Sequence, residues 1–272
     1  MAAIDGSATV RLGHSDLTVR PVGLGCMGMS QHYGPGDDAA SVQTIRTALD
    51  LGVDHLDTSD VYGASDITWG VPIRGFGHNE ELIAAAIAGR RDDVVLATKF
   101  AAKINETHAV HPITALQSEY WLWERGIEAE IAGVCRELGI TVVAYSPLGR
   151  SALTGALTPD ATFGPGDLRA TNPRFTTENL RTNLAPVAAL TALAEEKGCR
   201  PGQLALAWLL SRPWDVVAIP GTKRAEYVAE NLGATNVALS ADESAYLAEV
   251  FAPGTIVGER YAPVHARTVA AS

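Results

Sequence analysis

Short apolar segments alternate with amphipathic segments along most of the chain, and this alternation constrains the fold more than any other feature. Residues 21–27, 53–57, 94–98, 113–117, 141–145 and 216–219 have the length and composition of buried strands. Residues 38–51, 79–87, 128–138, 178–197, 201–211 and 225–231 have helical periodicity, and residues 10–20 predict a small hairpin. Because such alternation is typical of a parallel sheet, we expect one α/β domain over residues 1–272.

Composition limits the class of protein. Hydrophobic residues make up 47% of the 272 residues, so the chain can bury a large core. Its net charge of −10 argues against a nucleic-acid partner but allows one local basic pocket. The sequence has neither a long apolar run nor a signal-peptide pattern, which predicts no membrane partner. Three scattered cysteines, Cys26, Cys135 and Cys199, are typical of reduced thiols and predict a cytoplasmic protein.

The parallel sheet is either open or closed, and a glycine pattern bears on the choice. Gly23, Gly25 and Gly28 have the spacing of a dinucleotide-binding fingerprint, which belongs to open sheets. That fingerprint leads directly into a helix, whereas here Pro35 and Gly36 precede the next helix. The pattern therefore favours a closed barrel of the TIM type, with the glycines forming a tight strand end at its mouth.

Three chemically matched side chains lie where a barrel carries its functional groups, at the carboxyl ends of strands. Asp57 ends one predicted strand, Tyr62 follows five residues later, and Lys99 follows the next strand. An ammonium group beside Tyr62 would lower the pKa of the phenol and help it to protonate a carbonyl oxygen, while Asp57 orients the lysine. A buried Asp–Lys pair that only joins two strands, beside an ordinary tyrosine, explains the same spacing.

Eight motifs follow one another in a fixed order over most of the chain. They are Leu24-Gly-Cys-Met-Gly-Met-Ser30, Leu56-Asp-Thr-Ser-Asp-Val-Tyr-Gly63, Gly77-His-Asn-Glu-Glu81, Ala97-Thr-Lys-Phe100, Leu116-Gln-Ser-Glu-Tyr120, Tyr145-Ser-Pro-Leu-Gly-Arg150, Gln203-Leu-Ala-Leu-Ala-Trp208 and Ile219-Pro-Gly-Thr-Lys-Arg224. In this order they make the chain resemble the aldo-keto reductase superfamily, especially its bacterial members. The resemblance implies a TIM-type barrel that binds NADPH and reduces an aldehyde or ketone in a small organic molecule.

The resemblance also implies roles for individual residues. Asp57, Tyr62 and Lys99 fall on three of the four catalytic positions of the family. Gln117 matches the amide contact to the nicotinamide, Tyr145 matches the aromatic ring stacked beneath it, and the loop after Tyr145 matches the pyrophosphate loop. The implied cofactor contacts are Met27, Gln117, Tyr145, Ser146, Leu148, Arg150, Gly221, Thr222, Lys223, Tyr227, Glu230 and Asn231.

The charge pattern independently favours one part of this assignment. Lys223 and Arg224 lie just before a predicted helix N-terminus, where free amides already favour an anion. Two cations at that position in an acidic chain indicate a phosphate site, here the 2′-phosphate of the cofactor. A solvated Lys-Arg pair on a loop is the alternative.

Two departures from the family pattern affect the prediction. Residues 64–76 exceed the usual length after the tyrosine motif and predict a lid, a substrate wall or a surface excursion. Only the twelve residues Ala101 to Pro112 stand where the family has strands four and five with their helices, so we expect about six βα units. The family's catalytic histidine is lost with them, and His55, His108 and His111 are the candidates to replace it.

Loss of two βα units has consequences for assembly and for activity. Uncovered strand edges favour association, which predicts a homodimer whose interface includes the 101–112 connection. As an alternative, the short connection that begins at Ala101 is an omission of residues from a longer parent sequence. Two other functions stay open: a barrel repurposed for non-redox cyclisation, dehydration or isomerisation, and a non-catalytic NADPH-binding subunit.

Overall fold

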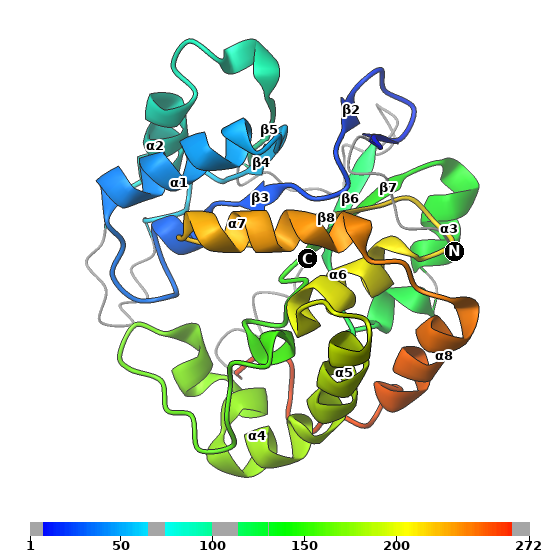
Figure 1. Cartoon of the computed structure of the whole chain (residues 1–272). Coiled ribbons are helices and arrows are strands. Elements are labelled where there is room, and N and C mark those ends of the chain that lie inside the picture. The colour runs from blue at the N-terminus through cyan, green and yellow to red at the C-terminus, as the bar shows by residue number, and fades with distance from the viewer. Residues whose placement is uncertain (1–7, 65–73, 100–113, 130, 263–272) are drawn as a thin grey trace.

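A computed structural model describes residues 8–64, 74–99, 114–129 and 131–262 of the chain. Its parallel strands fall into two sets: β3 (Leu24–Gly25), β4 (His55–Asp57) and β5 (Val95–Ala97), and then β6 (Ala115–Glu119), β7 (Thr141–Tyr145) and β8 (Val216–Ile219). Parallel bridges from Val22 to Ala218 and from Gly25 to Gly221 join the two sets. The strands therefore follow one path in the order β5-β4-β3-β8-β7-β6 (Figure 1).

This path confirms the prediction of a TIM-type α/β barrel, and six of its parallel strands lie in the described residues. Within the described ranges, β5 pairs only with β4 and β6 pairs only with β7, so the ring stays open between β5 and β6. The connection between these two strands includes residues 100–113, which lie outside the described part of the chain. The opening lies at the short connection where the resemblance implies that two strands are missing.

Helices pack around this curved sheet (Figure 1). Asp37 caps the first of them by accepting a hydrogen bond from the Ala40 amide, and Ser240 with Glu243 forms a capping box on the last. The described helices are α1 (Asp38–Asp50), α2 (His78–Ala86), α3 (Ile131–Leu138), α4 (Thr177–Asn183), α5 (Ala185–Glu196), α6 (Pro201–Leu210), α7 (Ala225–Leu232) and α8 (Ala241–Val250). None of them is long and apolar enough to cross a membrane.

The sequence prediction was wrong at two helices. The single helix expected over 178–197 is divided into α4 and α5 at Leu184, because Pro186 lies in the first turn of α5, where the ring fits but a continuous helix does not. Helix α8 was not predicted, although its capping box is visible in the sequence at Ser240 and Glu243.

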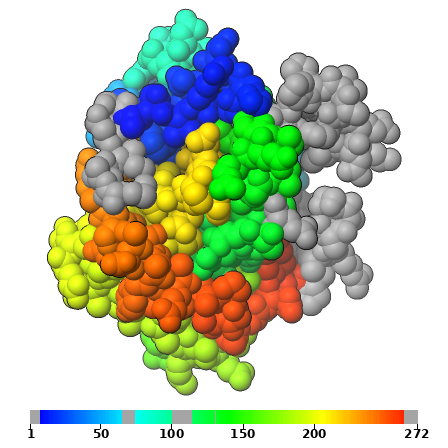
Figure 2. Space-filling model, turned by 90° about the vertical axis from the view of Figure 1, so that its right-hand side faces the viewer, coloured from blue at the N-terminus to red at the C-terminus, as the bar shows by residue number. Residues whose placement is uncertain are grey.

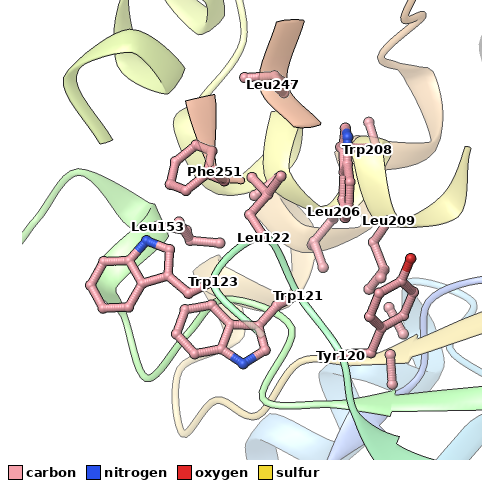
Figure 3. Packing of buried hydrophobic residues seen from close by; sticks show 14 of the residues in the cluster. Tyr120, Trp121, Leu122, Trp123, Leu153, Leu206, Trp208, Leu209, Leu247 and Phe251 are labelled. Carbon is pink, nitrogen blue, oxygen red and sulfur yellow. The ribbon is translucent and has the colours of Figure 1, made fainter. Parts of the chain in front are cut away.

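Apart from a small cluster of Leu12, Val19 and Val217, two larger hydrophobic clusters support the sheet. The larger one lies between β6–β8 and the helices of the second half, and it contains Trp121, Trp208 and Phe251 (Figure 3). The smaller one lies between β3–β5, α1 and α2, and Val228 of α7 joins it. Each set of three strands therefore has its own core.

A hairpin of β1 (Val10–Arg11) and β2 (Thr18–Val19) covers one end of the sheet, as predicted. The Gly13 amide donates to Oγ1 of Thr141, the first residue of β7, at 2.8 Å. Figure 2 shows the hairpin (dark blue) against the segment that contains β6 and α3 (green). Because the hairpin occupies the amino ends of the strands, a functional site is expected at the opposite, carboxyl ends.

Candidate active site

A buried carboxylate and an ammonium group meet at the carboxyl ends of β4 and β5. Lys99 Nζ donates to both carboxylate oxygens of Asp57, at 2.7 and 2.9 Å, and to the Thr58 carbonyl at 2.9 Å. Gln117 Nε2 donates to Asp57 Oδ2 at 2.6 Å from β6, across the open side of the ring. Three of the residues expected in the site are therefore in direct contact.

Tyr62 lies against this group. Lys99 Nζ is 5.0 Å from the centroid of the Tyr62 ring, so the ammonium faces the ring. Burial, followed by the negative charge of Asp57, raises the pKa of Tyr62 above its ordinary value. The expectation of a lowered pKa for Tyr62 was wrong, because removal of the phenol from water and the negative charge of Asp57 outweigh the nearby Lys99 ammonium.

A polar network beneath the site fixes the segments that carry it. Asn79 of α2 is fully buried, and its amide donates to the Cys26 carbonyl at 2.9 Å and to Ser30 Oγ at 2.7 Å. Its carbonyl oxygen accepts from Thr58 Oγ1 at 2.6 Å. Asn79 thus ties the loop after β3 to the residue that follows Asp57, and the sequence indicates it only through the Gly77-to-Glu81 motif.

The histidine candidates are placed unequally. His55 is buried on β4, and burial lowers the pKa of its imidazole, so the ring is neutral. Its Nδ1 has no hydrogen-bond partner in the described structure. His108, His111 and most of the 64–76 insertion lie outside the described residues, while Phe76 at the end of that insertion is 74% exposed.

The loop after β7 is held in a strained conformation. Ser146, Arg150 and Ser151 have positive φ angles of 52°, 54° and 75°, a region that side chains rarely adopt. Gly149 lies between them because a Cβ atom there would overlap the ring of Trp121. Such strain persists only where the surrounding packing enforces it, and it is common in loops that bind ligands.

Arg150 extends from this loop into the interior. Its side chain is 2% exposed and forms an ion pair with the buried Glu119, with Nη2 and Oε1 3.2 Å apart. Its other terminal nitrogen, Nη1, is buried without a hydrogen-bond partner in the described part of the chain. A buried guanidinium nitrogen without an acceptor fits the oxygen of an anionic ligand such as a pyrophosphate.

A second cationic group lies at the beginning of α7. Neither Lys223 nor Arg224 forms an ion pair with a carboxylate in the described ranges. Lys223 Nζ donates to the Tyr33 carbonyl at 2.7 Å, and burial lowers the pKa of its ammonium. Arg224 is exposed and lies 5.5 Å from the centroid of the Tyr227 ring. The two cations therefore have unneutralised charge beside a helix N-terminus.

The remaining predicted cofactor contacts are distributed around the same mouth. Gly221 packs against the Gly25 carbonyl. A Cβ atom on residue 221 would lie 3.3 Å from that carbonyl oxygen. Met27 begins a short 3₁₀ helix after β3, and Tyr145 ends β7. Ser146, Leu148, Thr222 and Glu230 are half-buried, and Asn231 is buried.

Sequence reasoning missed the residues that surround Tyr145. The Tyr145 hydroxyl contacts Tyr261 Oη at 2.8 Å and accepts from Arg260 Nη2 at 3.1 Å. Arg260 and Tyr261 come from the segment after α8, which carries none of the motifs described above. Within the described residues, there is no cluster of side chains that could hold a metal ion.

Comparison with known proteins identifies the family of this site. The sequence model of the "Aldo/keto reductase family" matches residues 21–108 and 101–252. A curated relative, the aldo-keto reductase yakc [NADP(+)] of Schizosaccharomyces pombe, is 32% identical over 326 residues that include 90% of this chain and 92% of the relative. Because that alignment is longer than the chain of 272 residues, the relative contains residues that this chain lacks.

Solved structures have the same fold. A glycerol dehydrogenase of Gluconobacter oxydans superposes with a TM-score of 0.76 at 22% identity, over 90% of this chain and 95% of that one. An aldo/keto reductase of Klebsiella pneumoniae, solved with NADP and acetate, superposes with a TM-score of 0.66 at 22% identity, over 93% and 98% of the two chains. This chain, with six of its parallel strands described, belongs to the aldo/keto reductase family.

Proposed function

We propose that the protein reduces an aldehyde or ketone of a small organic molecule with NADPH, and that Tyr62 protonates the carbonyl oxygen. The contact of Lys99 with both Asp57 and the Tyr62 ring is the observation that carries this proposal. A structural Asp–Lys pair alone gives no reason for the ammonium to face a half-buried tyrosine ring.

The residues around Tyr62 are suited to proton donation. Burial raises the pKa of Tyr62, so the phenol is protonated at neutral pH, but the same shift makes it a weaker acid. When the proton leaves, the negative charge on the phenolate forms beside the Lys99 ammonium, which stabilises it. Asp57 holds that ammonium in place through two hydrogen bonds.

The residues of the barrel mouth fit the nicotinamide cofactor. NADPH supplies a hydride to the carbonyl carbon when it is bound. Arg150, whose Nη1 lacks an acceptor, would hold the pyrophosphate, and Gln117 would contact the carboxamide. Lys223 and Arg224 would hold the 2′-phosphate, with Gly221, Thr222, Tyr227, Glu230 and Asn231 around it. Met27, Tyr145, Ser146 and Leu148 complete the proposed contacts.

Turnover of NADPH with a panel of aldehydes and ketones tests the proposal. We expect Tyr62→Phe to lower kcat by at least ~10²-fold while the dissociation constant for NADPH stays nearly unchanged, because only the proton donor is removed. Tyr120→Phe is the matched control, since it removes another buried tyrosine hydroxyl, which is bonded to Glu128 away from the site. Full activity of Tyr62→Phe would place the donor elsewhere. Turnover without consumption of NADPH would instead support the non-redox alternative.

We also propose that the protein is a homodimer. Support comes from the unpaired outer edges of β5 and β6 in the described structure, and from Ile131, Val134 and Leu138, which expose 44%, 50% and 46% of their surface along one side of α3. Light scattering should give about twice the chain mass of 28.6 kDa, and a monomer at high concentration would reject the proposal.

Location in the cytoplasm stays a prediction, in agreement with three free cysteines.

A further inference from the structure

The segment after α8 is anchored across the barrel mouth by hydrogen bonds to its backbone. Asn183 donates to the Val257 carbonyl at 2.9 Å and accepts from the Val257 amide at 2.8 Å. Asn172 donates to the Arg260 carbonyl at 3.1 Å. Arg174 donates to the Gly258 carbonyl at 3.3 Å. Because these anchors hold the backbone, the side chains of Arg260 and Tyr261 project from a fixed position.

Both side chains converge on one buried carboxylate. Glu119 Oε2 accepts from Arg260 Nε at 2.6 Å and from Tyr261 Oη at 3.0 Å, while Oε1 accepts from Trp121 Nε1 at 3.1 Å. Arg150 pairs with the same carboxylate. Glu119 thus links the end segment, through one fully buried group, to the loop that bears Arg150.

The same two side chains reach Tyr145. Among the residues that the structure describes, the Tyr145 hydroxyl forms hydrogen bonds only with Tyr261 and Arg260. Arg260 therefore donates in two directions, with Nε to Glu119 and with Nη2 to Tyr145. Its planar guanidinium keeps these two acceptors at a fixed separation, which a flexible lysine cannot do equally well.

We propose that Arg260 and Tyr261 are positioning residues for the cofactor, because they fix the ring of Tyr145 and the loop of Arg150 in the arrangement that binds NADPH. This inference rests on the proposed role of Tyr145 as the ring beneath the nicotinamide. A ring that ends β7 is restrained at its Cβ by the strand and at its hydroxyl by Arg260 and Tyr261. Without them the ring regains rotational freedom, which binding must then remove.

Titration of the purified protein with NADPH, followed by quenching of intrinsic fluorescence, tests the proposal. We expect Arg260→Gln and Tyr145→Phe each to raise the dissociation constant about tenfold, the usual effect of losing a hydrogen bond to a charged group. The double variant should raise the dissociation constant by less than the product of the two single effects, because both changes remove the shared Arg260–Tyr145 hydrogen bond. Arg260→Lys should recover part of the loss, and Tyr261→Phe should give a smaller rise.

Arg125→Gln is the matched control for stability. Arg125 is also a largely buried arginine paired with a carboxylate, that of Glu128, but it lies beside α3 and α8. Its loss should lower the melting temperature without changing the dissociation constant for NADPH. If Arg260→Gln and Tyr145→Phe bind NADPH as tightly as the parent, or if their effects add in the double variant, the positioning role is wrong. If the parent itself does not bind NADPH, the proposed function fails first and this inference fails with it.

Discussion

Replacing Lys99 by methionine separates the two explanations of the Asp57–Lys99 pair. The substitution keeps most of the side-chain volume but removes three hydrogen bonds, two to the Asp57 carboxylate and one to the Thr58 carbonyl. Asp57 is only 5% exposed and keeps Gln117 as its remaining donor, so its charge is left largely uncompensated. A catalytic pair and a structural pair predict the same loss of stability here, but different activities.

The magnitude follows from the burial of the two partners. Breaking a fully buried ion pair costs roughly 3–5 kcal/mol. Lys99 is 37% exposed, so water partly replaces the ammonium, and we expect a loss of about 2 kcal/mol in the free energy of unfolding. For a protein of 272 residues that corresponds to a fall of about 3–4 °C in melting temperature.

The double variant Asp57→Asn/Lys99→Met completes the test. It removes both charges together, so we expect at least half of the lost stability to return, measured by denaturant unfolding. Turnover should nevertheless stay at least ~10²-fold below the parent, since the phenolate formed by Tyr62 has lost its counter-charge. An active double variant would show that the pair is structural. A melting temperature for Lys99→Met within about 1 °C of the parent would refute the burial argument itself.

Three further predictions concern charge. Because burial raises the pKa of Tyr62, the absorbance difference between the parent and Tyr62→Phe should show no phenolate signal up to pH ~10. A phenolate signal below pH ~9 would contradict the raised pKa. Burial alone would raise the pKa of Glu119, but Arg150 and Arg260 lower the pKa overall. The ionised Glu119 therefore stabilises the folded protein fully above the unfolded pKa of about 4.3, and this stabilisation is lost as the pH falls through the lower folded pKa. Glu119→Gln should therefore be less stable than the parent by about 3 kcal/mol at neutral pH, and the difference should shrink in acid. A difference that stays constant with pH would show that the ionisation of Glu119 does not contribute to stability. Lys223→Glu should lower the affinity ratio of NADPH to NADH by about tenfold, whereas Arg136→Glu on α3 should not, and equal affinities in the parent would reject the 2′-phosphate site.

Periodicity and strand ends predicted the scaffold well, because they depend on local sequence. Asp57, Lys99 and Gln117 converge as expected of residues at the carboxyl ends of parallel strands. The predicted strand 113–117 is instead β6 at Ala115–Glu119, which shows how weakly a short apolar run fixes its own boundary. Pro186, which divides α4 from α5, stands inside an apolar periodicity that by itself predicts one continuous helix.

What the sequence could not provide was burial and long-range contact. The sign of the Tyr62 pKa shift depends on how far the phenol is removed from water, and spacing along the chain carries no such information. Arg260 and Tyr261 approach Tyr145 and Glu119 across 115 to 142 positions of sequence. Neither stands in a recognisable motif, so only the folded arrangement reveals them.

The division of most of the apolar core into two clusters, one for each set of three strands, has a consequence for how the molecule opens. Asp57 and Lys99 belong to the half supported by the smaller cluster, while Gln117 and Tyr145 belong to the half supported by the larger one. Such halves can act as distinct cooperative units, and the one with less buried apolar surface exchanges its amide hydrogens sooner. Amides of β4 and β5 should then lose protection before those of β7 and β8. A ligand that spans the mouth would join the two units, so its binding would appear as slower exchange across the β3–β8 seam.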